Sequence, residues 1–181
     1  MFAAAELRID RLEAPPSEAD TEALAKVLHA CVHAGASVGF ILPFELADAR
    51  RFWAEAVLPS LARGGRRLFI ARLDGEAVGT VQLCLETMPN QAHRADVSKL
   101  LVHPKARRRG IARALMLALE AAALDEGRSL LTLDTRSGDA AEPLYLSLGY
   151  ELAGRYPGYA RAPDVNELEA TSLMFKALAA A

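Results

Sequence analysis

Cysteine is scarce in this chain, and a long hydrophobic run is missing. Cys31 and Cys84 are its two cysteines, too few for a disulfide framework. Both lie among apolar residues, so we expect buried free thiols and a cytoplasmic protein. The longest uncharged stretch, residues 27–44, contains two histidines, two glycines, a serine and a proline, which excludes a membrane-spanning helix. The N-terminus reaches Glu6 and Arg8 before an apolar signal-peptide core develops.

Neither sign of charge dominates. The 21 basic and 23 acidic residues give a net charge of −2, which argues against a general polyanion binder. A hydrophobic content of 52% with so little net charge excludes a disordered chain. The length suits one domain with its own core, so we expect residues 1–181 to form a single domain.

Strand and helix patterns alternate along the chain without a repeat or a low-complexity linker. The expected strands are residues 5–10, 68–73, 77–85, 93–104, 129–135, 150–154 and 170–177. The first expected helix begins at Ser17 or Asp20 and ends at Gly35. Three more are expected at residues 44–61, 110–126 and 140–149. Asp74-Gly75 indicates a hairpin turn, while strand–helix–strand in the middle indicates a parallel crossover. Together these patterns predict a mixed α/β domain.

One segment concentrates positive charge. Between Pro104 and Arg113 lie five basic residues and no acidic one, and without these five the chain would carry −7. The run falls between a strand and a helix N-terminus, where free N–H groups and the helix dipole favour an anion. Gly110 lets a ligand approach the backbone. The segment therefore predicts a phosphate or pyrophosphate cradle rather than an ordinary solvated loop.

Two common nucleotide motifs are missing from this segment. It contains neither a Walker P-loop nor a G-x-G-x-x-G turn. Aromatic residues do not interleave the basic run, so a base-stacking nucleic-acid surface is unsupported. The histidines give no metal site, because His29 and His33 share a helix with Cys31 but lack a third ligand.

The cradle resembles the acetyl-CoA motif of the GNAT N-acetyltransferase superfamily. Arg107-x-x-Gly110-x-Ala112 matches [RQ]-x-x-G-x-[GA], and A-x-x-L-Y-x-x-L-G-Y follows at residues 141–150. The resemblance implies the GNAT fold, a single domain with a mixed, mostly antiparallel sheet flanked by helices. In that fold a parallel strand pair splays at the acetyl-CoA site.

A closer resemblance, to tabtoxin-resistance acetyltransferases, extends over most of the chain. It is carried by HAGASVGF, HRADVSKLLVHP, LLTLDT followed by SGDAAEPLY, and PGYARAPD. Those enzymes acetylate a small amino-acid-like toxin, so the resemblance implies a small-molecule amine as acceptor and a role in resistance. The acceptor-site residues it suggests are His33, Gly35, Ala36, Ser37, Val38, Gly39, Phe40 and Tyr159.

The same resemblance assigns the cofactor site. Pantetheine would pair with the strand at Leu100, Leu101 and Val102. The pyrophosphate would lie on Arg107, Arg108, Arg109, Gly110, Ile111, Ala112 and Arg113. Tyr145 matches the tyrosine that family enzymes place near the CoA sulfur, where it would protonate the thiolate. The alternative is a core tyrosine of the short helix.

The base is left open between Asp134, Asp96 and water. Asp134 lies in an apolar strand, where burial would raise its pKa toward a useful range; alternatively it caps the next turn. Strand alternation puts Asp96, Ser98, Leu100 and Val102 on one face, with Val97, Lys99, Leu101 and His103 on the other. Asp96 could equally be paired with Arg94 or Lys99.

Two positions depart from the family pattern. Ser98 stands where many members carry glutamate, and Gly138 where many carry asparagine. The resemblance as a whole implies direct acetyl transfer from acetyl-CoA to the primary amine of a small amino-acid-like molecule. The alternatives are acetylation of a protein N-terminus or lysine, and a non-catalytic acyl-CoA-binding module. We expect no nucleic-acid, membrane or metal partner, and a homodimer is possible through the apolar C-terminal strands.

Overall fold

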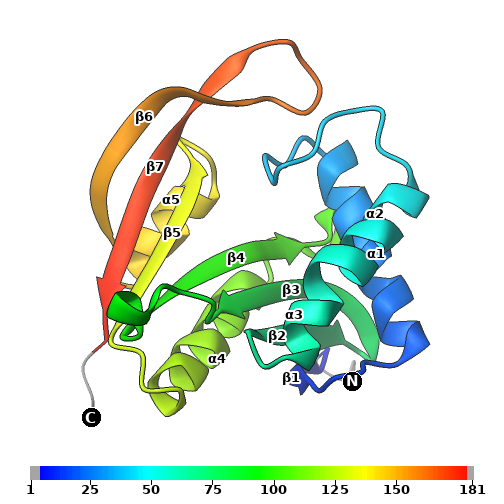
Figure 1. Cartoon of the computed structure of the whole chain (residues 1–181). Coiled ribbons are helices and arrows are strands. Elements are labelled where there is room, and N and C mark those ends of the chain that lie inside the picture. Colours follow the sequence, from blue (N-terminus) through cyan, green and yellow to red (C-terminus); the bar gives the residue numbers. More distant parts are fainter. Residues whose placement is uncertain (1–4, 179–181) are drawn as a thin grey trace.

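The computed structural model describes residues 5–178 as one seven-stranded sheet with helices on both faces (Figure 1). Its strand order is β1-β2-β3-β4-β5-β7-β6, and β4 and β5 are the parallel pair. The strands are β1 (Leu7–Leu12), β2 (Arg66–Leu73), β3 (Glu76–Cys84), β4 (Arg94–Val102), β5 (Leu130–Arg136), β6 (Glu151–Arg161) and β7 (Leu168–Ala177). The helices are α1 (Glu18–His33), α2 (Leu46–Phe52), α3 (Leu58–Ala62), α4 (Ile111–Asp125) and α5 (Ala141–Ser147). These observations confirm the predicted mixed α/β fold.

Local sequence signals account for most element boundaries. The Ser17 hydroxyl accepts the N–H of Asp20 at 3.0 Å and so caps α1. Helix α1 ends before Gly35, whose φ is +80°. The predicted helix at 44–61 is α2 and α3 joined through the π-helical turn Trp53–Val57. The predicted hairpin is β2 and β3, which turn at Asp74-Gly75.

Two hydrophobic cores lie on opposite faces of the sheet. Helix α4 packs on one face, where Leu115, Met116 and Leu119 are buried. Helices α1 to α3 cover the other face, where Leu24, Leu28 and Trp53 are buried. Both cysteines are free thiols, one buried and one half-buried.

Strands β4 and β5 separate soon after they meet. Their pairing extends only from Arg94–Leu130 to Asp96–Thr132, although β4 runs on to Val102 and β5 to Arg136. In Figure 1 the two strands diverge, with β7 and β6 following β5. The second half of β4 therefore keeps β3 as its partner on one side and has an unpaired edge on the other.

A β-bulge in β4 overturns the predicted strand alternation. The register between β3 and β4 shifts between the Thr80–Leu101 and Gln82–Ser98 pairs, and Lys99 has φ +52°. An extra residue reverses the facing of everything beyond it. Val97 therefore packs with Leu100 in the α4 core, while Leu101 is buried in the opposite core. The predicted grouping of Leu100 with Ser98 and of Leu101 with Val97 is wrong.

The C-terminal hairpin is longer than its sequence pattern suggested. Strand β6 continues to Arg161 rather than ending near Gly154, and its pairing with β7 has two irregularities. It is an edge strand with mostly exposed side chains, among them Leu152 and Tyr156. No helix in residues 5–178 has both the length and the apolar character needed to cross a bilayer.

Candidate active site

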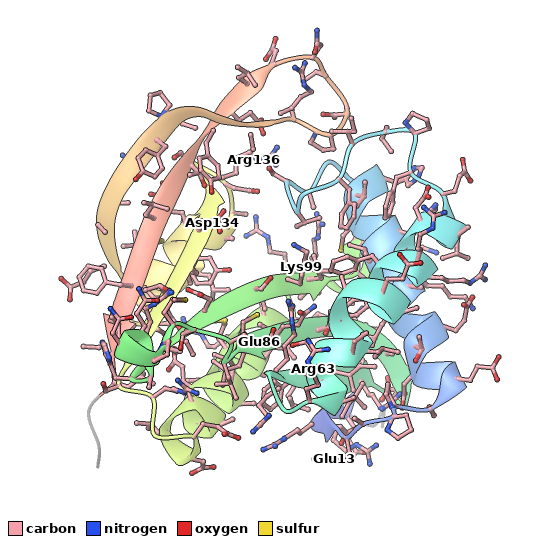
Figure 2. The ribbon with its side chains drawn as sticks, in the orientation of Figure 1. Glu13, Arg63, Glu86, Lys99, Asp134 and Arg136 are labelled. Atoms are coloured by element: carbon pink, nitrogen blue, oxygen red, sulfur yellow. The ribbon has the colours of Figure 1, made fainter. Side chains whose placement is uncertain are left out.

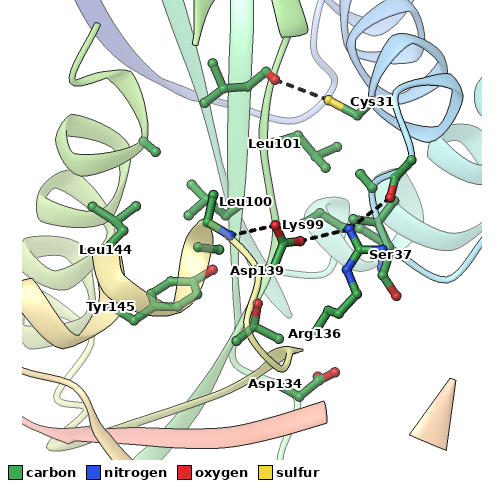
Figure 3. Close-up of a pocket in the computed structure, with 18 of the residues that line it drawn as sticks. Cys31, Ser37, Lys99, Leu100, Leu101, Asp134, Arg136, Asp139, Leu144 and Tyr145 are labelled. Atoms are coloured by element: carbon green, nitrogen blue, oxygen red, sulfur yellow. Dashed lines mark hydrogen bonds and ion pairs between the residues drawn. The ribbon is translucent and has the colours of Figure 1, made fainter. Parts of the chain in front are cut away.

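A cavity of about 770 Å³ occupies the opening between β4 and β5. Its walls come from the end of α1, the second half of β4, the start of α4, the end of β5, α5 and the β6–β7 hairpin. Most of the predicted site residues line it: Gly35, Ala36, Ser37, Val38, Gly39, Leu100, Leu101, Val102, Arg107, Arg108, Gly110, Ile111, Ala112, Arg113, Asp134, Tyr145 and Tyr159. The fold thus gathers segments that lie far apart in sequence around one space (Figure 3).

The turn before α4 presents free backbone donors to this cavity. Arg108 and Gly110 have φ of +65° and +75°, and the chain turns there directly into the helix. Within the described part of the chain, the N–H groups of residues 108–113 have no hydrogen-bond acceptor. Free N–H groups and basic side chains at a helix start form a site for a phosphate or pyrophosphate.

The open edge of β4 supplies a second set of backbone groups. The Leu101 carbonyl faces β3, since a Cβ on Gly79 would lie 2.9 Å from it. The backbone N–H and C=O groups of successive residues point to opposite sides of a strand. Those of Leu100 and Val102 therefore point away from β3, toward the cavity. The Val102 carbonyl accepts from Cys31 Sγ at 3.4 Å and from Arg107 Nε at 3.3 Å. An extended amide-bearing ligand could pair with this edge as an added strand.

Tyr145 lies on α5 with its ring buried and its residue on the cavity wall. It is 6% exposed and packs edge-to-face on Tyr150 at 5.6 Å between centroids. Burial raises the pKa of Tyr145 far above its usual value, and the negative charges of Asp134 and Asp139 raise it further. The hydroxyl therefore keeps its proton at neutral pH and can act as a donor to a developing anion.

Asp134 is a solvated carboxylate rather than a buried one. Its side chain is exposed although its neighbour Leu133 is buried. The expectation of burial in an apolar strand is wrong, because β4 has already separated from β5 at this position. Among the described residues Asp134 has no ion-pair partner, and it is close enough to Tyr145 for its charge to act on that hydroxyl.

Four predicted site residues do not line the cavity. Asp96 precedes the bulge, and its Oδ1 accepts from Arg94 Nη1 at 2.5 Å and from the Thr132 hydroxyl. His33 Nε2 is bonded to the Phe44 carbonyl at 2.8 Å. Phe40 packs against Phe44 and Phe52 at the core under α1 to α3. Arg109 is the one arginine of residues 107–113 that does not line the cavity.

Two cavity cations were not singled out from the sequence. Lys99 lies at the bulge, and the signal that could have found it is a lysine directly before the apolar residues 100–102. Arg136 follows the end of the LLTLDT strand. Its guanidinium donates to the Gly35 carbonyl at 3.1 Å and pairs with Asp139 and Glu169, both at 3.2 Å. Figure 2 shows Lys99, Asp134 and Arg136 around the opening between the two halves of the sheet.

Loops from both halves of the molecule meet over the cavity. The N–H of Leu42 donates to the Pro163 carbonyl at 2.9 Å. A Cβ on Gly35 would lie 3.7 Å from the Asp164 carboxylate. Together with the bond from Arg136 to Gly35, these contacts join the α1–α2 loop to β5 and the β6–β7 hairpin. These segments therefore bound the acceptor side of the cavity, which stays open to solvent.

The donor set fits acetyl-CoA. The free N–H groups and arginines at residues 107–113 match a pyrophosphate, the open edge of β4 matches the pantetheine amides, and Tyr145 lies on the wall of the same cavity. Among residues 5–178 no group of three or more His, Cys, Asp or Glu is arranged to hold a metal ion.

Comparisons with known proteins agree with this geometry. Residues 64–152 match the acetyltransferase (GNAT) domain family. An uncharacterized N-acetyltransferase from the hisH-hisA intergenic region of Azospirillum brasilense is 34% identical over 139 residues, 75% of this chain and 77% of that protein.

Two solved structures share the fold. The protein yncA of Salmonella typhimurium, solved with its cofactor acetyl-CoA, has a TM-score of 0.76 at 16% identity, with 96% of this chain and 94% of that one covered. A ribosomal-protein-alanine N-acetyltransferase from Brucella melitensis has a TM-score of 0.74 at 23% identity, with 94% and 99% covered. The free N–H cradle, the splayed strands and the related sequence lead to one conclusion: this chain belongs to the GNAT family and is an acetyl-CoA-dependent N-acetyltransferase.

Proposed function

We propose that the enzyme acetylates the primary amine of a small amino-acid-like molecule by direct attack in a ternary complex. The observation that carries the proposal is that one cavity contains a protonated tyrosine, Tyr145, a solvated carboxylate, Asp134, and the free N–H groups that fit CoA. Acetyl-CoA supplies the acetyl group as a thioester. Direct transfer requires a proton acceptor for the amine and a proton donor for the departing thiolate.

Tyr145 is our general acid. Its raised pKa suits a donor and argues against a base, because the ionised form is disfavoured by burial and by Asp134. The hydroxyl would give its proton to the thiolate sulfur as the carbon–sulfur bond breaks. The packing of the ring against Tyr150 fixes its direction.

Asp134 is our proton acceptor, directly or through a water. The exposed carboxylate faces the cavity and has no competing ion pair among the described residues. Asp96 is a weaker candidate, because Arg94 and Thr132 already occupy one of its carboxylate oxygens. Ser98 also lines the cavity, but a hydroxyl cannot replace the glutamate that many family members have there.

The loops that bound the acceptor side favour a small molecule over a protein. The Leu42–Pro163 and Gly35–Arg136 bonds hold these loops together, which leaves less room for an extended peptide. A toxin or antibiotic acceptor, and hence a resistance role, follows from the resemblance to tabtoxin-resistance enzymes. The homodimer and the cytoplasmic location stay predictions; the exposed edge strand β6 is where we expect a second copy to pair.

The test is a CoA-release assay over amino acids, dipeptides, polyamines, aminoglycosides and a peptide with a free N-terminal amine. We expect turnover of one or more small amines and little turnover of the peptide. Preferential acetylation of the peptide would support the protein-acetylating alternative instead. Tight acetyl-CoA binding without turnover of any amine would support the non-catalytic acyl-CoA-binding module.

A further inference from the structure

Lys99 brings a half-buried positive charge to the acceptor side of the cavity. Its side chain lines the cavity, and Nζ lies 5.6 Å from the centroid of the Phe52 ring. A Cβ on Gly39 would lie 3.9 Å from Nζ, so the amine sits beside the acceptor loop. Among the described residues Lys99 has no salt bridge. Burial lowers its pKa, which the charge of Asp134 partly offsets.

The fold does not require a lysine amine at this position. Lys99 has φ +52° at the bulge, a conformation that costs a residue with a side chain roughly 1–3 kcal/mol. Glycine or asparagine would form the same bulge with less strain. The bulge therefore does not need the lysine amine, which stands on a strained backbone at the cavity wall.

Lys99 and Asp134 are a cation and an anion of the cavity wall. Arg136, by contrast, is held in ion pairs with both Asp139 and Glu169. Neither Lys99 nor Asp134 forms an ion pair with a described residue, although the charge of Asp134 acts on Lys99. One free cation and one free anion in the same cavity are complementary to a zwitterion (Figure 3).

We propose that Lys99 binds an anionic group of the acceptor, so that the substrate is an amine that also carries a carboxylate or a phosphonate. In this arrangement the amine lies toward Asp134 and Tyr145, and the anion lies against Lys99 and Gly39. This inference rests on the proposed function and adds the determinant of acceptor specificity. An unpaired cation that is partly removed from water gains most from a ligand of opposite charge.

The experiment uses matched acceptors: amino acids, the corresponding amino-acid amides, and aminoalkylphosphonates. Initial rates of CoA release give kcat/KM for each acceptor with wild type, Lys99→Met and Lys99→Arg. Lys26→Met is the control, because Lys26 is an exposed lysine of α1 with its own partner, Glu22, at 3.8 Å. Thermal unfolding and acetyl-CoA affinity show whether each variant is folded and binds the cofactor.

We expect wild type to prefer the acid over its amide by about tenfold to a hundredfold, the scale of one charge-assisted contact. Lys99→Met should bring this ratio close to one, mainly through KM, while Lys99→Arg and Lys26→Met retain it. If aminoalkylphosphonates are acetylated as well as amino acids, Lys99 recognises the negative charge of the group rather than its shape. A wild-type ratio near one, or an unchanged ratio in Lys99→Met, overturns the inference and leaves acetyl transfer standing. Failure to acetylate any amine overturns both proposals.

Discussion

Replacing Tyr145 by phenylalanine isolates the proposed proton donor, because only the hydroxyl is lost. The ring stays available for its edge-to-face contact with Tyr150 at 5.6 Å, and the residue is already 6% exposed. Among the described residues no hydrogen bond to this hydroxyl contributes to its pKa shift, so the substitution leaves no orphaned partner. We expect the unfolding free energy to change by less than about 0.5–1 kcal/mol.

The expected effect on turnover is much larger. Loss of a general acid lowers kcat by roughly a hundredfold to ten-thousandfold, which corresponds to about 2.7–5.4 kcal/mol of the activation barrier. The affinity for acetyl-CoA should be nearly unchanged. The assay is CoA release at saturating acceptor, combined with a direct measurement of acetyl-CoA binding.

Tyr150→Phe is the matched control. Tyr150 is also a buried tyrosine, its ring is the one against which Tyr145 packs, and it is not part of the cavity wall. We expect it to keep wild-type turnover. Burial holds the pKa of Tyr145 above its usual value of 10.0, so wild type should show no loss of rate from this group below about pH 10. Equal turnover in Tyr145→Phe and wild type would refute the acid role.

Three other substitutions test the architecture. Gly79→Ala places a Cβ 2.9 Å from the Leu101 carbonyl and 3.3 Å from Ile111 and Leu115; we expect a loss of about 1–3 kcal/mol, measured by urea denaturation. The double change Arg107→Gln and Arg108→Gln should raise the Kd for acetyl-CoA about tenfold. It should also weaken the salt dependence of that Kd, seen in titrations at two ionic strengths.

The third, Glu142→Gln, tests the turn that carries α5. Its carboxylate accepts the Gly138 N–H at 2.7 Å and Arg155 Nη2 at 2.6 Å, and these bonds hold its pKa below the usual 4.5. The stabilisation is therefore complete above about pH 4.5 and is lost as the pH falls through the lower, folded pKa. Glu142→Gln should cost about 1–2 kcal/mol at pH 7, and the difference from wild type should shrink in acid.

The cofactor side could be predicted because its determinants are consecutive in the sequence. Five bases, a glycine and an amphipathic helix follow one strand directly, so the free N–H groups of residues 108–113 require no distant contact. Tyr145 is assigned through the family resemblance, on the A-x-x-L-Y-x-x-L-G-Y pattern of residues 141–150. Such local signals predict which residues can bind, and here the cavity wall contains all of residues 107–113 except Arg109.

The acceptor side could not be predicted in the same way, because it depends on where strands part. The exposure of Asp134 follows from the divergence of β4 and β5 after three paired residues. The reversal of Leu100 and Leu101 follows from one extra residue at Lys99. Neither the separation nor the facing of residues beyond the bulge can be derived from a two-residue alternation, because both depend on how β4 pairs with its neighbours.

The bulge also joins the two halves of the site. The unpaired edge of β4 leaves the Leu100 backbone groups and the Val102 N–H available to the pantetheine arm, and the bulge places Lys99 on the acceptor side. One short stretch of β4 therefore carries both the cofactor edge and the charge that faces the acceptor. A substitution that regularised β4 would be expected to impair acetyl-CoA binding and acceptor selectivity together, whereas loss of the Lys99 charge alone should affect only selectivity.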